Sequence, residues 1–170
     1  MRDTTSPATN QASGGSPHQK AAGEQNAAQA LVEFFGAAIC IYSRAQAIAD
    51  GVLVDISSTA REAGLAWPVA MTQAAWADCV AWTSSDDGRK REYTGQSESG
   101  RLWDVVWAAS VAVRAGLRRG LDGTQPLPFQ LYRVPREGRG LRPRLTTLQL
   151  RVGPGDAGEP VITILLPGED

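Results

Sequence analysis

The sequence predicts an α+β fold, in which helices pack on a small, mostly antiparallel sheet with a C-terminal three-stranded meander. Three observations lead to this prediction. A short capped helix runs directly into the apolar segment Val52–Val54. Apolar residues recur at helical spacing over Arg101–Leu117, and apolar and polar residues alternate over Leu145–Val152. Helical and strand periods therefore occur in separate parts of one chain, as in α+β proteins.

The first 26 residues contain no Val, Ile, Leu, Phe, Tyr or Trp. Because such a segment has little apolar surface to bury, residues 1–26 are expected to form a disordered tail. Residues 27–170 are long enough to bury one core and are expected to form a single globular domain. At its start, Ala27–Phe35 is predicted to be a helix and Ala37–Tyr42 a strand.

The best-defined local signal follows at Ser43. Ser43 and Gln46 have the spacing of a capping box, in which each side chain bonds the other residue's backbone N–H. This spacing predicts a helix over Arg44–Asp50, and Gly51 suits the left-handed position that ends a helix. Val52–Val54 is then predicted to be a short strand.

A second short helix is predicted next, with Thr59 and Glu62 as its capping box and Gly64 as its end. Leu65–Val69 should be extended, since a residue that precedes proline avoids the helical region. Thr72 is expected to cap a helix that runs to about Trp82.

In that third helix Trp76, Cys79 and Val80 have the spacing of a buried face. Both cysteines of the chain, Cys40 and Cys79, are expected to be buried and structural. Thr83–Gly100, which is polar and includes the basic triplet at residues 89–91, is predicted to be a loop or an exposed hairpin.

The helix over Arg101–Leu117 is apolar around more than half of its circumference, because Trp103 and Trp107 widen its stripe. It is therefore expected to be central, with Val106 in the core and packing on both sides. After a linker rich in glycine and proline, Phe129–Val134, Leu145–Val152 and Val161–Leu166 are predicted to form the antiparallel meander.

Several segments together resemble a known family. They are YSRAQAIADGVLVDIS at 42–57, TAREAG at 59–64, WPVA at 67–70, WADCV at 76–80, GRLWD at 100–104 and YRVPR at 132–136. The C-terminal GPGD at 153–156 and LPGED at 166–170 also match. The chain resembles, over about residues 34–170, a small uncharacterised bacterial family met on plasmids, integrative elements and phages. The resemblance implies a mobile-element setting and assigns no site residues.

Charge is distributed unevenly, although the net charge is only −1. Arg89–Arg151 contains 13 basic and 5 acidic residues, which gives a local balance of +8. No run approaches the roughly 18 apolar residues of a membrane span, and no signal peptide is recognised. The protein is expected to be soluble and cytoplasmic, without a membrane partner.

The sequence contains little of the machinery of catalysis. The only histidine, His18, lies in the predicted tail, which argues against His-dependent nucleophiles and against His-ligated metal. No phosphate-binding glycine motif occurs, so no cofactor and no metal are predicted. A carboxylate-based enzyme remains as an alternative, with candidate acids at Asp50, Asp55, Glu62, Asp78 and Asp104.

The clearest functional candidate is a cluster of arginines near the C-terminus. Glycine and proline separate the arginines of Pro135–Pro143, here named the arginine loop, so their guanidinium groups are expected to splay rather than pair. Guanidinium groups suit phosphate and carboxylate partners. The predicted partner-binding residues are Arg133, Arg136, Arg139, Arg142, Arg144 and Arg151.

These observations favour a non-enzymatic binding protein of a mobile genetic element, such as a counter-defence factor that acts by occupying a host or element-encoded protein. The alternative from the same surface is a nucleic-acid-binding module that uses the Arg133–Arg151 face. Arg-rich loops in Arg-rich sequences are also often only solvated, and 15 of the 17 basic residues here are arginine. The oligomeric state does not follow from the sequence.

Overall fold

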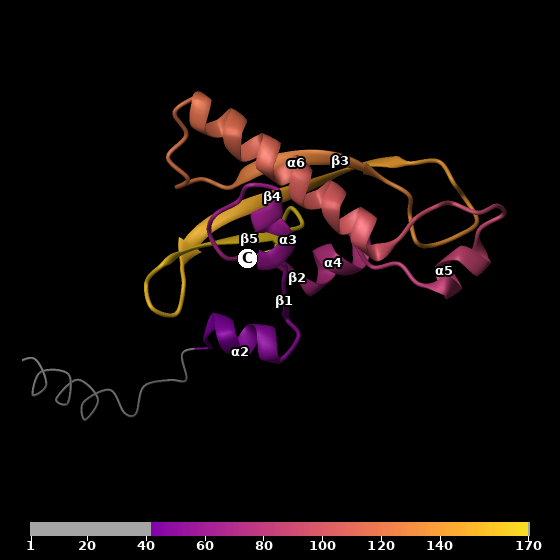
Figure 1. Ribbon diagram of the computed structural model, residues 1–170, viewed down its shortest axis with the longest axis horizontal. Coiled ribbons are helices and arrows are strands. Elements are labelled where there is room, and N and C mark those ends of the chain that lie inside the picture. Colours follow the sequence, from indigo (N-terminus) through magenta and orange to yellow (C-terminus); the bar gives the residue numbers. More distant parts are fainter. Residues whose placement is uncertain (1–41, 170) are drawn as a thin grey trace, which may run out of the picture. The chain divides into compact units, whose positions relative to one another are not determined.

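The computed structural model describes residues 42–169 (Figure 1). The predicted tail over 1–26, the helix over 27–35 and all but the last residue of the strand over 37–42 lie outside this part, as does Cys40. The described helices are α2 (Arg44–Ala49), α3 (Ser57–Glu62), α4 (Gln73–Cys79), α5 (Ser84–Arg89) and α6 (Glu98–Arg118). The strands are β1 (Leu53–Asp55), β2 (Val69–Thr72), β3 (Leu127–Arg133), β4 (Arg144–Pro154) and β5 (Pro160–Leu165).

The five strands form one sheet in the order β1-β2-β5-β4-β3. All neighbouring pairs are antiparallel except β2 and β5, in which Val69 lies opposite Ile162. The predicted α+β fold and the C-terminal meander of β3, β4 and β5 are therefore confirmed. The parallel pair was not predicted, because the predicted extended segment ends at Val69, where β2 begins.

Helix α6 lies across β3 and the middle of the sheet (Figure 1). Val105, Val106 and Ala109 of α6 are fully buried against apolar side chains such as Leu148 and Ile164 of the sheet. The prediction that Val106 belongs to the core is confirmed. Helices α3 and α4 contact α6 as well, so one apolar core joins the helices to this face of the sheet.

Helix α2 lies on the other face of the sheet. The guanidinium group of Arg44 donates to the Thr163 hydroxyl at 2.9 Å and to the Ile162 carbonyl at 2.8 Å. Thr163 alternates with Ile162 and Ile164, which belong to the core on the α6 side, so its side chain points away from that core. The Ser43–Gln46 capping box is present, and Gly51 has φ of +72°, so both predictions are confirmed.

The start of α3 differs from the prediction, whereas the start of α4 agrees with it. The Thr59–Glu62 capping box is wrong, because α3 begins at Ser57 and its N-cap, Ile56, makes no side-chain bond. The Ser57 hydroxyl instead donates to Asp55, and it also accepts from the Val69 N–H at 3.1 Å, which fastens α3 to the strands. Thr72 does cap α4 by accepting from the Ala75 N–H at 3.2 Å.

Helix α4 ends at Cys79 rather than at Trp82. Cys79 and Val80 are buried as predicted, whereas Trp76 is only partly buried and packs at the edge of the core. The expected loop after Thr83 contains helix α5. The prediction of a loop or an exposed hairpin is therefore wrong for Ser84–Arg89, and no strand occurs between residues 83 and 100.

The outer face of α6 is the largest departure from the sequence-based prediction. Trp103 is 39% exposed, Trp107 50% and Val111 48%. Helix α6 therefore packs on one side only, and the prediction that it packs on both sides is wrong within the described residues. The side chains that widen the apolar stripe are those that the fold leaves at the surface.

Candidate docking surface at the arginine loop

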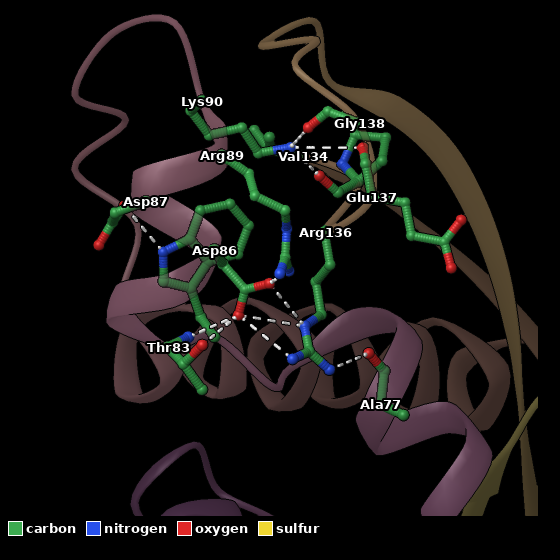
Figure 2. A network of polar contacts seen from close by, with 12 residues as sticks. Ala77, Thr83, Asp86, Asp87, Arg89, Lys90, Val134, Arg136, Glu137 and Gly138 are labelled. Carbon is green, nitrogen blue, oxygen red and sulfur yellow. Dashed lines mark hydrogen bonds and ion pairs between the residues drawn. The ribbon is translucent and has the colours of Figure 1, made fainter.

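The arginine loop joins β3 to β4 at the end of the sheet near α5 (Figure 1). Residues of α5 and of the turn that follows it hold the loop in place (Figure 2). The contacts are built around two buried charges, the Lys90 ammonium and the Asp86 carboxylate. Only 8% of Lys90 and none of Asp86 is exposed.

Lys90 fixes the backbone of the loop. Its ammonium donates to the carbonyl oxygens of Pro135 at 2.6 Å, Gly138 at 3.1 Å and Gly140 at 3.3 Å, and lies 3.5 Å from that of Glu137. Burial, together with the neighbouring Arg89 charge, lowers the Lys90 pKa. The carbonyl oxygens supply the hydrogen bonds that a buried ammonium requires. The loop therefore curls around one cation.

Lys90 also belongs to a stack of cations on Trp82. The Lys90 amino group lies 5.6 Å from the centre of the Trp82 ring, and the Arg101 guanidinium lies 5.0 Å from it. These distances are within the range of cation–π attraction. Arg101 is itself buried and donates to the carbonyls of Val80 at 3.0 Å and Val134 at 2.9 Å. The root of the loop is thereby tied to α4 and α6.

Asp86 anchors a side chain of the loop. Its carboxylate accepts hydrogen bonds from the Thr83 N–H at 2.7 Å and from Arg136 Nη2 at 3.2 Å, and it forms an ion pair with Arg89. Burial alone would raise the Asp86 pKa, but the hydrogen bonds from Thr83 and Arg136 outweigh burial and hold the pKa at about 2. The carboxylate is therefore ionised at neutral pH.

The expectation that the loop guanidinium groups splay is wrong for one of the three arginines of the loop, Arg136, and Arg133 just before the loop is also paired. Arg136 pairs with Asp86, and Arg133 donates to Asp78 through Nε at 2.9 Å. Asp86 of α5 lies 50 residues from Arg136 in the chain, and Asp78 of α4 lies 55 residues from Arg133. These two arginines fasten the loop to the helices.

The other predicted arginines divide into two groups. Arg139, Arg142 and Arg144 are exposed, the first two within the loop and the third at the first residue of β4. Arg151 is partly buried and lies seven residues further along β4, opposite Thr163. A strand rises about 3.3 Å per residue, so Arg151 is roughly 20 Å from Arg144 and does not share the loop surface.

A basic hollow lies between the loop and the end of α5. Its volume is about 550 Å³, and it is lined by Gly88, Arg89, Lys90, Arg91, Gly138 and Arg139. The basic triplet at residues 89–91 is visible in the sequence, but its pattern alone indicates no role. The triplet lies close to the loop because it follows helix α5. The capping-box spacing of Thr83 and Asp86 could have indicated that helix.

The candidate acids of the enzyme alternative do not gather in one place. Asp78 is paired with Arg133, Asp55 accepts from Ser57, and Asp50 accepts from Tyr42. The other two, Glu62 and Asp104, are exposed on separate helices. Among residues 42–169 no three His, Cys, Asp or Glu side chains are placed to hold a metal ion.

Cys79 is not poised as a nucleophile. Burial raises the pKa of its thiol to about 11, and the Asp78 charge adds to the rise. The thiolate, which is the reactive form, is therefore scarce at neutral pH. The prediction that Cys79 is a buried structural residue agrees with this placement.

Comparisons with known proteins extend the description in one respect. The model of the family of unknown function DUF6573 matches residues 31–170. No curated protein and no solved structure matches the chain. None of the helices between residues 42 and 169 combines the length and the apolar character needed to cross a membrane.

Proposed function

We infer the function of this chain, which belongs to the DUF6573 family, from its own surface, because the family has no known function. We propose that the protein is a non-enzymatic binding protein that recognises an anionic partner. The docking surface comprises the exposed arginines Arg139, Arg142 and Arg144 together with the basic hollow at the end of α5.

One observation carries this proposal: buried charges hold a loop whose own residues contribute little to the core. Placing an ammonium and a carboxylate away from water costs free energy that hydrogen bonds must offset. A loop that merely connected β3 to β4 would not need Lys90 and Asp86. Holding the loop in one conformation reduces the entropy lost on binding, which favours affinity.

The partner that we propose is a host or element-encoded protein with an acidic patch. Guanidinium groups bind carboxylates through paired hydrogen bonds, and Arg139, Arg142 and Arg144 present three of them. The resemblance to proteins of plasmids, integrative elements and phages makes an accessory or counter-defence role the natural setting. In that setting, occupying a partner is sufficient for function.

The test is a pull-down from the native host, read by mass spectrometry, with three forms of the full chain. The first is the unchanged protein, and the second carries Arg139→Ser and Arg142→Ser. The matched control carries Arg61→Ser and Arg119→Ser, which also removes two exposed arginines but from outside the loop. We expect a partner protein that the unchanged chain and the control capture and that the Arg139→Ser, Arg142→Ser variant does not. Equal capture by all three would contradict the proposal.

A nucleic-acid partner is the second candidate, and two exposed tyrosines favour it. Tyr93 is 88% exposed and follows the basic triplet, and Tyr132 is 68% exposed beside Arg133. Arginines that contact phosphates, together with aromatic rings that stack on bases, are the usual means of binding single strands.

Three phosphate contacts would give a slope of log K against log salt of roughly −2 to −3. Titration of labelled single- and double-stranded oligonucleotides at about 50 and 200 mM salt measures it, and no binding at the lower salt would remove this candidate.

A further inference from the structure

The outer face of α6 exposes apolar and charged side chains to solvent. Trp103, Trp107 and Val111 follow one another at intervals of four residues, and the two indole rings stack with their centres 6.3 Å apart. Arg114 and Arg118 continue the same side of the helix, because each lies three or four residues further on. Exposed tryptophans beside arginines are the side chains that most often dominate protein interfaces. The face therefore has the composition of an interface.

The charges on the exposed side of α6 are separated along its axis. Asp104 is exposed in the N-terminal half, whereas Arg114 and Arg118 are exposed in the C-terminal part. Val111 lies midway between Asp104 and Arg118 in the sequence. A second α6 laid antiparallel across Val111 would therefore place an acidic part against a basic part at both ends.

We propose that this face binds a second copy of the chain, with the two α6 helices antiparallel about a two-fold axis near Val111. Asp104 then lies alongside Arg118 of the partner subunit, and the symmetry repeats this pair. The two helix dipoles oppose each other, which is also favourable. Such a self-complementary patch is what a two-fold dimer requires.

An apolar pocket near the C-terminal end of α6 fits the same arrangement. The pocket has a volume of about 530 Å³, and Trp67, Leu117 and Leu121 are among its lining residues. About the axis at Val111, residue 103 of one helix is level with residue 119 of the other. The partner's Trp103 is thereby brought to the end of α6 where this pocket lies.

The other occupants of this face are an unrelated protein and residues 1–41 of the same chain. The charge separation along α6 favours a second copy over both.

Sedimentation velocity of the full chain from about 1 to 200 μM tests the proposal, since a modest interface gives micromolar affinity. The wild type should pass from monomer to dimer over this range. Trp107→Ser should remain monomeric, and a circular dichroism melt should show that it is folded. A wild type that is monomeric throughout, or a folded Trp107→Ser that dimerises like the wild type, would overturn the proposal.

Charge reversal tests the antiparallel arrangement directly. Asp104→Arg makes the exposed face basic at both ends, and Arg118→Glu leaves an acidic residue at each end, so each variant alone should dimerise at least about tenfold more weakly. An equimolar mixture should dimerise again, because both ion pairs re-form across the mixed dimer. Failure of the mixture to dimerise would overturn the arrangement. A dimer that forms only when residues 1–41 are removed is the remaining outcome. That result would show that the N-terminal segment of the same chain covers the face, and it would also overturn the proposal.

Discussion

Lys90 reaches from the end of α5 to the arginine loop, where its ammonium lies against the carbonyl oxygens of Pro135, Gly138 and Gly140. Nothing in the local sequence separates this lysine from Arg89 and Arg91 on either side. Only its burial distinguishes it, and burial depends on residues 45 to 50 positions away. The residue that shapes the loop could therefore not be recognised from the sequence.

Replacing Lys90 with Met should leave those carbonyl oxygens without their donor. Hydrogen bonds to charged groups contribute about 1.5–3 kcal/mol, so we expect a loss of that order in the free energy of unfolding. Urea denaturation measures it. The neighbouring Arg91→Met is the control and should change stability by less than about 0.5 kcal/mol, because Arg91 is exposed. Equal effects of the two substitutions would show that Lys90 does not hold the loop.

Asp86→Asn should destabilise the protein by about 3–5 kcal/mol, because it removes the charge that the partly buried Arg136 faces. The wild type should also have an acid dependence that the variant lacks. Folding lowers the Asp86 pKa from 3.8 to about 2. Stability from this group is therefore present above about pH 4 and is lost as pH falls towards 2.

Protonation of Asp86 should lower the free energy of unfolding by roughly 2 kcal/mol, since one pKa unit corresponds to about 1.4 kcal/mol. Urea denaturation at about pH 6 and pH 2 gives the change in unfolding free energy with pH for the wild type and for Asp86→Asn. The difference between these two changes is the contribution of Asp86. A variant whose stability falls with acid as steeply as that of the wild type would contradict the role assigned to Asp86.

At the scale of elements, the sequence predicted α2, α6 and the meander because each carries its own periodic or capping signal. Helix α5 was not predicted, since Ser84–Arg89 is rich in Ser, Asp and Gly, which favour caps and turns. It is held instead by the Asp86 contacts described above. Strand β2 was misplaced for a similar reason, because its four residues owe their conformation to β1 and β5 on either side.

Gly51 provides a test of the element that the sequence defined best. Its φ is +72°, and a Cβ added there would meet no atom within 4 Å. Any cost of substitution is therefore backbone strain rather than collision. Gly51→Val should cost about 1–2 kcal/mol, whereas Gly51→Asn should cost less, because Asn tolerates this region. Thermal melts compare the two variants, and equal midpoints would show that the turn accepts another conformation.

At the scale of the whole molecule, the basic excess over Arg89–Arg151 was visible in the sequence, but its arrangement was not. The fold buries or pairs Lys90, Arg101, Arg133 and Arg136, and leaves the exposed arginines of the loop beside those of the α5 turn. Half of the predicted site is thus present at the loop surface. The sequence could not assign the rest, because each pairing joins segments far apart in the chain.

The mismatch on α6 is informative at the same scale. The apolar stripe of α6 is wider than the part of the helix that the fold buries. The apolar side chains that remain exposed mark a surface that needs another partner. The loop and the outer face of α6 are separate surfaces, so binding of an anionic partner and self-association can be tested independently.

The central claim is that the arginine loop is fixed before any partner binds. Backbone ¹⁵N relaxation of the full chain tests it most directly, by giving order parameters for the amides of residues 136–142 in the wild type and in Lys90→Met. We expect values near 0.85 in the wild type, as in rigid backbone, and a fall towards about 0.6 or below in the variant. Wild-type values already below about 0.6 would contradict a pre-organised docking surface.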